Sequence, residues 1–436
     1  MTTATARDTR FAPLRVANFR LFAASRFSSG IGMTLLRMQV LWHVHEISGS
    51  AFQLGLVGLV QFLPSLGLSL VGGAVADAYD RRRVAMLAHI VPLCCTSLLF
   101  FATSRGEDTL WLIYALVFVI SIATAFENPA RTALLPSLVP RELFPLSVTL
   151  YTGFQMMAFM TGPALQGLVV AFAGRASPYA VHVGLGLISL GGLALLRPRP
   201  LEGEPRKVSL SAIAEGLAYV RNNQVVLGCM TLDMFAVLFG GAVALLPIYA
   251  KDILASGDVG YGILASSLEA GAFGMWILLM ILPPIQRLGR ALIIAVAVFG
   301  LATIVFGFSR SFPLSVAAYM AVGMADYVSV VIRGIAIQLQ TPDALRGRVS
   351  SVNMIFIGAS NQLGAVESGF VAAITSATFA VVSGGVASLT ALAVIARRLP
   401  ELRRYTLSSS GPPEDGTRHE EEVDTDRAEE PLSRSS

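Results

Sequence analysis

Long apolar stretches separated by short polar turns run through most of the chain. A helix that crosses a bilayer needs about 20 mostly apolar residues, and the chain contains twelve stretches of that kind. They cover residues 20–45, 51–76, 84–104, 110–128, 146–172, 178–196, 225–248, 258–284, 291–309, 313–338, 349–374 and 376–396. Turns such as "HEISGS", "SRGEDT" and "FSRSFP" separate them. This pattern predicts twelve transmembrane helices.

The composition agrees with that pattern. Hydrophobic residues make up 54% of the 436 residues, charged residues make up 14%, and the mean hydropathy is +0.66. Soluble domains carry about 25% charged residues. We therefore predict an all-α membrane protein embedded in a lipid bilayer.

Basic residues gather at one set of helix ends. That set holds Arg7, Arg10, Arg15, Arg81–Arg83, Arg131, Arg141, Arg197, Arg199, Arg206, Lys207, Arg221, Arg287, Arg290, Arg346, Arg348, Arg397, Arg398, Arg403 and Arg404. The opposite ends hold only Arg105, Arg175, Lys251 and Arg310. The positive-inside rule places the first set in the cytoplasm. We expect a multi-pass protein of the plasma (inner) membrane with both termini cytoplasmic and no removable signal peptide.

An internal repeat divides the spans into two groups of six. A shift of 202 residues superposes Arg131 on Arg333, Gly162 on Gly364 and Gly167 on Gly369, together with the prolines of the preceding turns. Because the two groups have the same orientation, we predict a parallel duplication related by a pseudo-two-fold axis. The expected parts are a cytoplasmic N-terminus (1–19), a first half (20–196), a linker (197–224), a second half (225–398) and a tail (399–436).

The linker and the tail have distinct compositions. Leu210, Ile213, Leu217 and Val220 share one helical face, which predicts an amphipathic helix at the cytoplasmic surface. From Thr406 onward nine acidic residues stand against three arginines. Such a segment cannot bury enough apolar surface to fold. We expect a disordered acidic tail in the cytoplasm.

Charged residues inside spans are costly and usually functional. The candidates are Arg26 and Arg37 in span one, Asp233 in span seven, Glu269 in span eight, Asp326 in span ten and Glu367 in span eleven. Arginines thus occur in the first half and carboxylates in the second, while residues 110–126 of span four carry no charge. Each candidate is either a substrate-binding or proton-coupling residue or part of a structural ion pair. Arg26 could also reach the membrane surface.

The segment between spans two and three resembles a known signature. It reads Gly73, Ala74, Val75, Ala76, Asp77, Ala78, Tyr79, Asp80, Arg81, Arg82, Arg83. With two six-span halves, it is similar to the Gly-x-Leu-x-Asp signature of the major facilitator superfamily, although Asp80 replaces the usual glycine. "ENPARTALLPSLVPRELF" and "TPDALRGRVSSVN" resemble its exporter branch, which includes the enterobactin exporter and drug:proton antiporters.

This resemblance implies roles for two further sets of residues. Asp77 and Arg81 are expected to form a latch between the halves when the cytoplasmic side is closed; otherwise the arginines only set the topology. "MTGPALQG" is similar to the span-five element of antiporters, which assigns Gly162, Pro163 and Gly167 to it. These residues could equally serve ordinary helix packing.

Other chemistries find little support in the sequence. Cys94, Cys95 and Cys229 lie in apolar spans and suggest no disulfide, and His43 and His45 lie on different helix faces. No nucleophile or phosphate-loop motif occurs. We therefore expect no metal, no cofactor and no enzymatic activity.

These observations favour a secondary active transporter that works by alternating access. Its partners would be a small amphiphilic molecule (a siderophore, drug or metabolite), protons and the lipid bilayer, with no nucleic acid, and it would act as a monomer. The first hypothesis is proton-coupled efflux. The alternatives are a proton-coupled importer and, less favoured, a non-transporting sensor or a membrane enzyme on the same scaffold.

Overall fold

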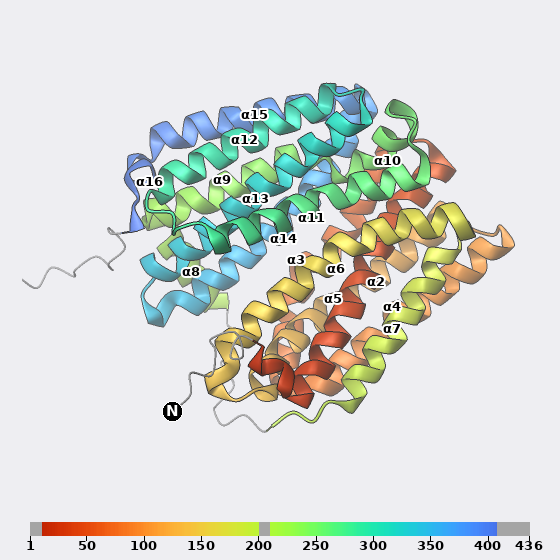
Figure 1. Ribbon diagram of the computed structural model, residues 1–436, viewed down its shortest axis with the longest axis horizontal. Coiled ribbons are helices and arrows are strands. Elements are labelled where there is room, and N and C mark those ends of the chain that lie inside the picture. The colour runs from red at the N-terminus through yellow and green to blue at the C-terminus, as the bar shows by residue number, and fades with distance from the viewer. Residues whose placement is uncertain (1–10, 200–209, 408–436) are drawn as a thin grey trace, which may run out of the picture.

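The computed structural model describes residues 11–199 and 210–407, except for the side chains of a few helical residues, Asp77 among them. Within these ranges the chain is helical and forms no strand. The helices form two bundles that lie side by side (Figure 1).

The first bundle contains six long helices. They are α2 (Ala17–Ser48), α3 (Ala51–Ala78), α4 (Arg81–Arg105), α5 (Leu110–Leu138), α6 (Phe144–Ala173) and α7 (Ser177–Leu195). The short 3₁₀ turns η1 (Ala12–Arg15) and η2 (Arg141–Leu143) precede α2 and α6.

The second bundle begins after a short helix, α8 (Leu210–Asn222). It contains α9 (Gln224–Gly240), η3 (Ala242–Leu245), α10 (Leu246–Ile248), the π-helical turn η4 (Tyr249–Ile253), α11 (Gly257–Ile281), α12 (Leu288–Phe308), α13 (Phe312–Gln340), α14 (Asp343–Ile374), α15 (Ala377–Arg398) and α16 (Pro400–Arg404).

These segments agree with the predicted spans. In the described part of the chain, nine helical segments are long and apolar enough to cross a membrane, and the segment from Gln224 to Ile253 counts as one of them. The helices α2, α3 and α14, with 32, 28 and 32 residues, occupy the three remaining positions in the predicted order. The all-α membrane fold is thereby confirmed.

Local chemistry sets the helix ends. Gly49 and Gly106 follow α2 and α4 with φ of 59° and 71°, a left-handed conformation that suits glycine. Asp80 caps α4, since its carboxylate accepts a hydrogen bond of 2.8 Å from the backbone N–H of Arg83. The acidic residue at the usual glycine position of the signature therefore starts a helix.

The two bundles repeat the same helix pairs. In the first, α2 packs on α6 and α7, α4 on α5 and α7, and α3 on α5. In the second, α9 packs on α14 and α15, α12 on α13 and α15, and α11 on α13. Numbered as spans one to six in each half, these pairs are identical. The parallel duplication predicted from the sequence is therefore present in the packing.

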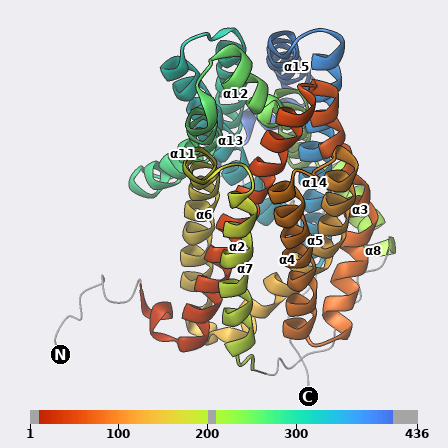
Figure 2. The same cartoon turned by 90° about the vertical axis from the view of Figure 1, so that its right-hand side faces the viewer.

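The bundles touch through α3 with α14 and through α6 with α11 (Figure 2). These contacts lie toward the helix ends that carry few basic residues, which we call the arginine-poor end. We call the opposite end, with Arg81–Arg83 and Arg141, the arginine-rich end. There, Phe52 and Phe370 pack edge to face at 4.8 Å between ring centroids. His45 of α2 lies 3.2 Å from Asp252 of η4. The halves are joined at this end.

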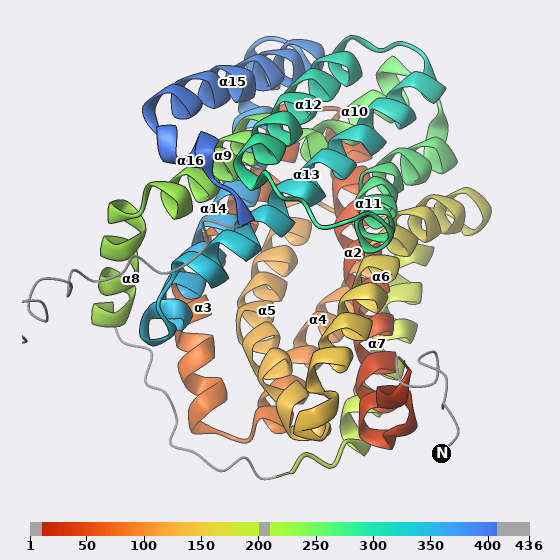
Figure 3. The same ribbon diagram turned by 60° about the vertical axis from the view of Figure 1, so that its left-hand side comes forward.

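The linker and tail differ in part from expectation. An amphipathic helix forms as α8, which packs on α14 and α9 at one edge of the second bundle (Figure 3). The expected disordered tail from 399 is corrected at its start: α16 is helical, and Leu402 is buried because it packs against α9 and α12. Residues 408–436, and residues 200–209 of the linker, lie outside the described ranges.

Candidate functional site

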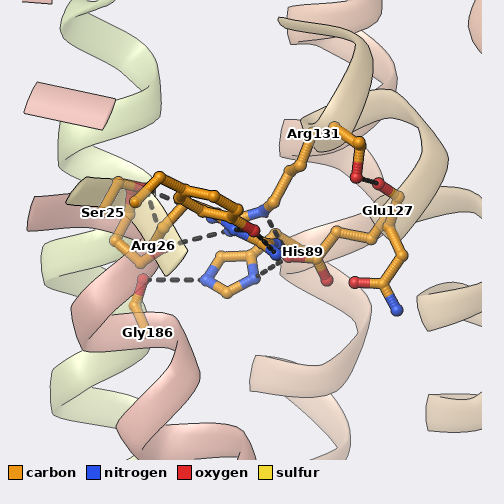
Figure 4. Close-up of polar contacts among 10 residues, drawn as sticks. Ser25, Arg26, His89, Glu127, Arg131 and Gly186 are labelled. Atoms are coloured by element: carbon orange, nitrogen blue, oxygen red, sulfur yellow. Dashed lines mark hydrogen bonds and ion pairs between the residues drawn. The ribbon is translucent and has the colours of Figure 1, made fainter. Parts of the chain in front are cut away.

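A cluster of ionisable side chains lies inside the first bundle (Figure 4). His89 on α4 and Glu127 and Arg131 on α5 are each at most 4% exposed. Nδ1 of His89 lies 2.9 Å from Oε1 of Glu127, and Nε2 lies 3.1 Å from the carbonyl oxygen of Gly186 on α7. Nε of Arg131 lies 2.6 Å from the same Glu127 oxygen. The N–H of Nε is not aligned for a hydrogen bond, so this contact is an ion pair.

Two serines hold the other nitrogens of Arg131. One terminal nitrogen donates to Oγ of Ser25 on α2 at 3.2 Å, and the other donates to Oγ of Ser189 on α7 at 3.0 Å. The two hydroxyl oxygens are 3.0 Å apart. A charged guanidinium buried in a membrane protein needs such partners, so the cluster ties α2, α5 and α7 together.

Arg26 borders this cluster. Its guanidinium donates to the Tyr151 hydroxyl on α6 at 2.6 Å and lies 5.5 Å from the centre of that ring. It also interacts electrostatically with Glu127 and Arg131. The structure therefore places Arg26 inside the first bundle, against α6, in a cation–π contact.

A small cavity of about 10 Å³ adjoins the cluster. It is lined by Ser29, Gly32, Met33, His89, Pro92, His182 and Gly186. His182 is 3% exposed, and its Nδ1 has no hydrogen-bond partner in the described part of the chain. The cavity thus lies between two buried imidazoles and is close to the size of one water molecule.

The second bundle contains a related pair. Asp233 on α9 and Arg333 on α13 are 5% and 4% exposed and form an ion pair, to which Ser329 adds a hydrogen bond of 3.2 Å. Arg333 occupies the repeat position of Arg131, and Ser329 occupies that of Glu127. Both halves therefore have the arginine at the same repeat position. Its carboxylate partner lies on the same helix, α5, in the first half and on another helix, α9, in the second half.

This arrangement corrects two expectations. Span four was expected to end near 128, with Arg131 at a cytoplasmic turn, but α5 continues to Leu138 and buries Glu127 and Arg131. The separation by sign is also wrong, because Glu127 lies in the first half and Arg333 in the second. Sequence reasoning missed these residues, although "ENPAR" and the Arg131–Arg333 match were available as signals.

A further charged set connects the halves. Arg37, at the middle of α2, is exposed and interacts electrostatically with Glu269 on α11. Glu269 also interacts with Asp326 on α13. Both carboxylates are half-buried. The structure brings together three of the six predicted charges and separates them from Arg26 and Asp233.

Glu367 on α14 stands apart from both sets. It is half-buried, and it accepts a hydrogen bond of 3.3 Å from the Ser368 hydroxyl. That hydroxyl also lies 3.2 Å from the carbonyl oxygen of Gly241, where α9 ends. Glu367 therefore lies near the point where span seven passes from α9 to the 3₁₀ turn η3.

The predicted latch residues lie at the arginine-rich end. Arg81, the first residue of α4, donates a hydrogen bond of 3.1 Å to the carbonyl oxygen of Ala133 in the same half. Asp77 belongs to α3, but its side chain lies outside the described part. The latch stays a prediction.

The span-five element lies at two helix contacts. A Cβ at Gly162 would come within 2.8 Å of the carbonyl oxygen of Ile31 on α2. One at Gly167 would come within 2.9 Å of Cα of Gly262 on α11. Pro163 lies between these contacts inside α6. The element therefore brings α6 close to helices of both halves, while its role in antiport stays a prediction.

No group of three His, Cys, Asp or Glu side chains in the described ranges could hold a metal ion. His43 instead lies 2.8 Å from Asp108 and 2.8 Å from the Tyr179 hydroxyl. Arg175 is 3.4 Å from the second Asp108 oxygen.

Comparison with known proteins places this arrangement. A family model described as "Transmembrane secretion effector" matches residues 8–429. The chain belongs to this family. Among curated relatives, this chain is 28% identical over 408 residues to "Multidrug efflux pump Tap" of Mycobacterium tuberculosis. The match covers 89% of this chain and 94% of that protein. The chain is 25% identical over 395 residues to "Enterobactin exporter EntS" of Shigella boydii, covering 89% and 93%.

Solved structures of other transporters share the fold of this chain. A bacterial homologue of the human lysosomal transporter Spinster, in an inward-facing and unoccupied conformation, superposes with a TM-score of 0.68 at 14% identity, covering 94% of this chain and 100% of that one. The predicted major facilitator fold and the resemblance to its exporter branch are confirmed.

Proposed function

We propose that the protein is a proton-coupled exporter of an amphiphilic small molecule. It acts as a monomer in the plasma membrane, with both termini in the cytoplasm. The observation that carries this proposal is the set of ionisable side chains inside the membrane-spanning helices of a chain from a secretion family. Charges at that depth usually serve ion or substrate pathways.

Arg37, Glu269 and Asp326 would form the exchange site. The two carboxylates interact with each other across α11 and α13, and Glu269 also interacts with Arg37 of the other half. Relative movement of the halves changes the distance of Arg37 from the carboxylates, and therefore their affinity for a proton. A proton from one side and a cationic group of the substrate from the other can then compete for the same carboxylates.

Under the proposed topology, the arginine-poor end faces outward. The two halves meet at that end, so this conformation corresponds to an inward-facing transporter. We place the Asp77–Arg81 latch in the opposite conformation, in which the cytoplasmic side is closed. Alternating access requires such one-state contacts.

The names of the relatives support a drug or a siderophore as the class of substrate. One is called a multidrug efflux pump and another an enterobactin exporter. We therefore choose ethidium and enterobactin as probes.

The test uses inside-out membrane vesicles with an imposed pH step. If the lumen is acidified, an antiporting exporter accumulates the probe in the lumen, whereas a proton-coupled importer empties it. Vesicles without the protein provide the control. The exporter proposal fails if the pH step drives the probe out of the lumen or has no effect beyond that control.

A further inference from the structure

The hydrogen bonds of His89 contain a proton that a neutral imidazole and a carboxylate lack. The Gly186 carbonyl only accepts hydrogen bonds, so Nε2 of His89, 3.1 Å away, carries a hydrogen. Nδ1 faces the Glu127 carboxyl oxygen at 2.9 Å. Either Nδ1 also carries a hydrogen, which makes an imidazolium, or the carboxyl group does.

We propose that His89 and Glu127 form a proton-binding site in the first half, whose occupancy is coupled to transport. This proposal rests on the proposed function and adds a proton site separate from the carboxylates of the second half. The two groups share this one proton across the 2.9 Å contact.

Loss of the proton breaks this contact. A carboxylate oxygen and an unprotonated Nδ1 would then point lone pairs at each other across 2.9 Å. Arg131 already lies against the same carboxylate oxygen and can balance its charge alone. The site can therefore release a proton without leaving a buried, uncompensated carboxylate, which would be costly.

Among the described side chains, the other ionisable groups around the pair come from four helices. Arg26 on α2 and Arg131 on α5 contribute positive charge, and Tyr151 on α6 holds Arg26. His182 on α7 lies across the small cavity from His89. Two positive charges and one further imidazole therefore surround the pair.

The same packing links the pair to helix movement. Arg131 also binds Ser25 of α2 and Ser189 of α7. When the proton leaves and Arg131 must hold Glu127 alone, these hydroxyl contacts compete for the guanidinium. Helix α2 also carries Arg37, which interacts with Glu269 of the second half. A change in the protonation of the pair therefore acts on α2 and, through it, on the contact between the halves.

The first test reads the proton directly. The chain has five histidines, so ¹⁵N-histidine NMR of the full-length protein in lipid nanodiscs can assign His89 through the His89→Gln variant. We expect an imidazole that titrates with a shared proton and whose titration shifts in Glu127→Gln. His43 is the matched control. It also has a carboxylate partner, but Tyr179 can donate to its other nitrogen, so it needs no extra proton.

The second test measures coupling in inside-out vesicles with ethidium. Glu127→Gln and His89→Gln should lose accumulation driven by the pH step but retain exchange of ethidium without a pH step, and His43→Gln should keep both. His89→Gln keeps the Glu127–Arg131 ion pair, so it answers the question if Glu127→Gln does not fold.

The outcomes separate this inference from the proposed function. Wild-type protein that responds to the pH step, together with variants that respond equally, overturns the inference and leaves the proposed function standing. Unchanged His89 titration in Glu127→Gln also overturns it. Wild-type protein without any pH response overturns the proposed function, and the coupling role of the pair with it, whatever the NMR shows.

Discussion

Individual carboxylates in the membrane-spanning helices differ in what surrounds them, and their roles should differ accordingly. Asp233 forms a buried ion pair with an arginine of its own half, whereas Glu269 interacts both with Asp326 and with Arg37 of the other half. A pair within one half stabilises that half. A set that spans both halves changes when the halves move, so coupling belongs to the second set.

Asp326→Asn tests this role. The substitution removes the ionisable carboxyl group but keeps its shape, so we expect no accumulation driven by a pH step while binding of ethidium remains measurable. Flux in inside-out vesicles and direct binding to purified protein give the two readings. If Asp326→Asn still accumulates ethidium uphill, Glu269 or Glu367 takes over the assignment.

Asp233→Asn should act on stability instead. It leaves the Arg333 charge buried without its carboxylate, and breaking a buried pair in this way costs about 3–5 kcal/mol. We expect a clearly lower midpoint of thermal unfolding in detergent. The double variant Asp233→Leu with Arg333→Met should recover much of the loss. A single variant as stable as the wild type would contradict the structural role.

Asp108 predicts a dependence of stability on pH. Burial raises the pKa of this loop carboxyl, but the hydrogen bond from His43, with the charge of Arg175, outweighs it and holds the pKa below its usual value. A depressed pKa contributes stability above the unfolded-state value, about 3.9, and this contribution is lost as pH falls through the folded-state value. Thermal unfolding between pH 3 and 7 should show this loss in the wild type and not in Asp108→Asn.

At the scale of helices, the repeated glycines have matching positions. Gly162 brings α6 against α2, and its repeat partner Gly364 brings α14 against α9. Gly167 brings α6 against α11, and its partner Gly369 brings α14 against α3. The first pair joins helices within each half, and the second joins the two halves. Small residues at such crossings allow the backbones to approach closely.

Gly167→Ala should therefore shift the conformational equilibrium. A Cβ there would lie 2.6 Å from the carbonyl oxygen of Asp258, a backbone atom that cannot turn aside. We expect the arginine-poor end to open, seen as a longer distance between spin labels at Ser104 on α4 and Phe308 on α12. Gly184→Ala on α7 is the matched control, since its Cβ would meet nothing within 4 Å. Equal distances in both variants would contradict this reading.

At the scale of the whole molecule, the distribution of arginines predicts the orientation in the membrane. In a variant with its three native cysteines replaced, single cysteines at Glu107 and Ser311 should react with an impermeant maleimide added to intact cells. A cysteine at Glu142 should react only after the cells are opened. All three positions are exposed. Labelling of Glu142→Cys in intact cells would reverse the topology.

The sequence alone determined the helical membrane fold and the duplication. Runs of about 20 apolar residues leave few alternatives, because a backbone in lipid must satisfy its hydrogen bonds internally. The repeat of Arg131 at Arg333 and of Gly167 at Gly369 was also visible in the sequence, because both halves pack the same pairs of helices. Apart from the start of the tail, which α16 corrects, the domain boundaries stay predictions, as do the latch at Asp77 and the identity of the substrate.

The tertiary structure decided which charges meet. Hydropathy is averaged over a window of residues. Glu127 and Arg131 lower that average after the uncharged stretch 110–126, so the sequence predicted that the span ends there, although α5 continues to Leu138. Only packing shows that Glu127 is buried against His89 of α4, which in turn donates a hydrogen bond to the Gly186 carbonyl of α7. Asp233 and Arg333 are 100 residues apart in the chain, and no periodicity relates them. Partners on different helices depend on how the helices rotate and cross, and that is fixed by contacts distant in sequence.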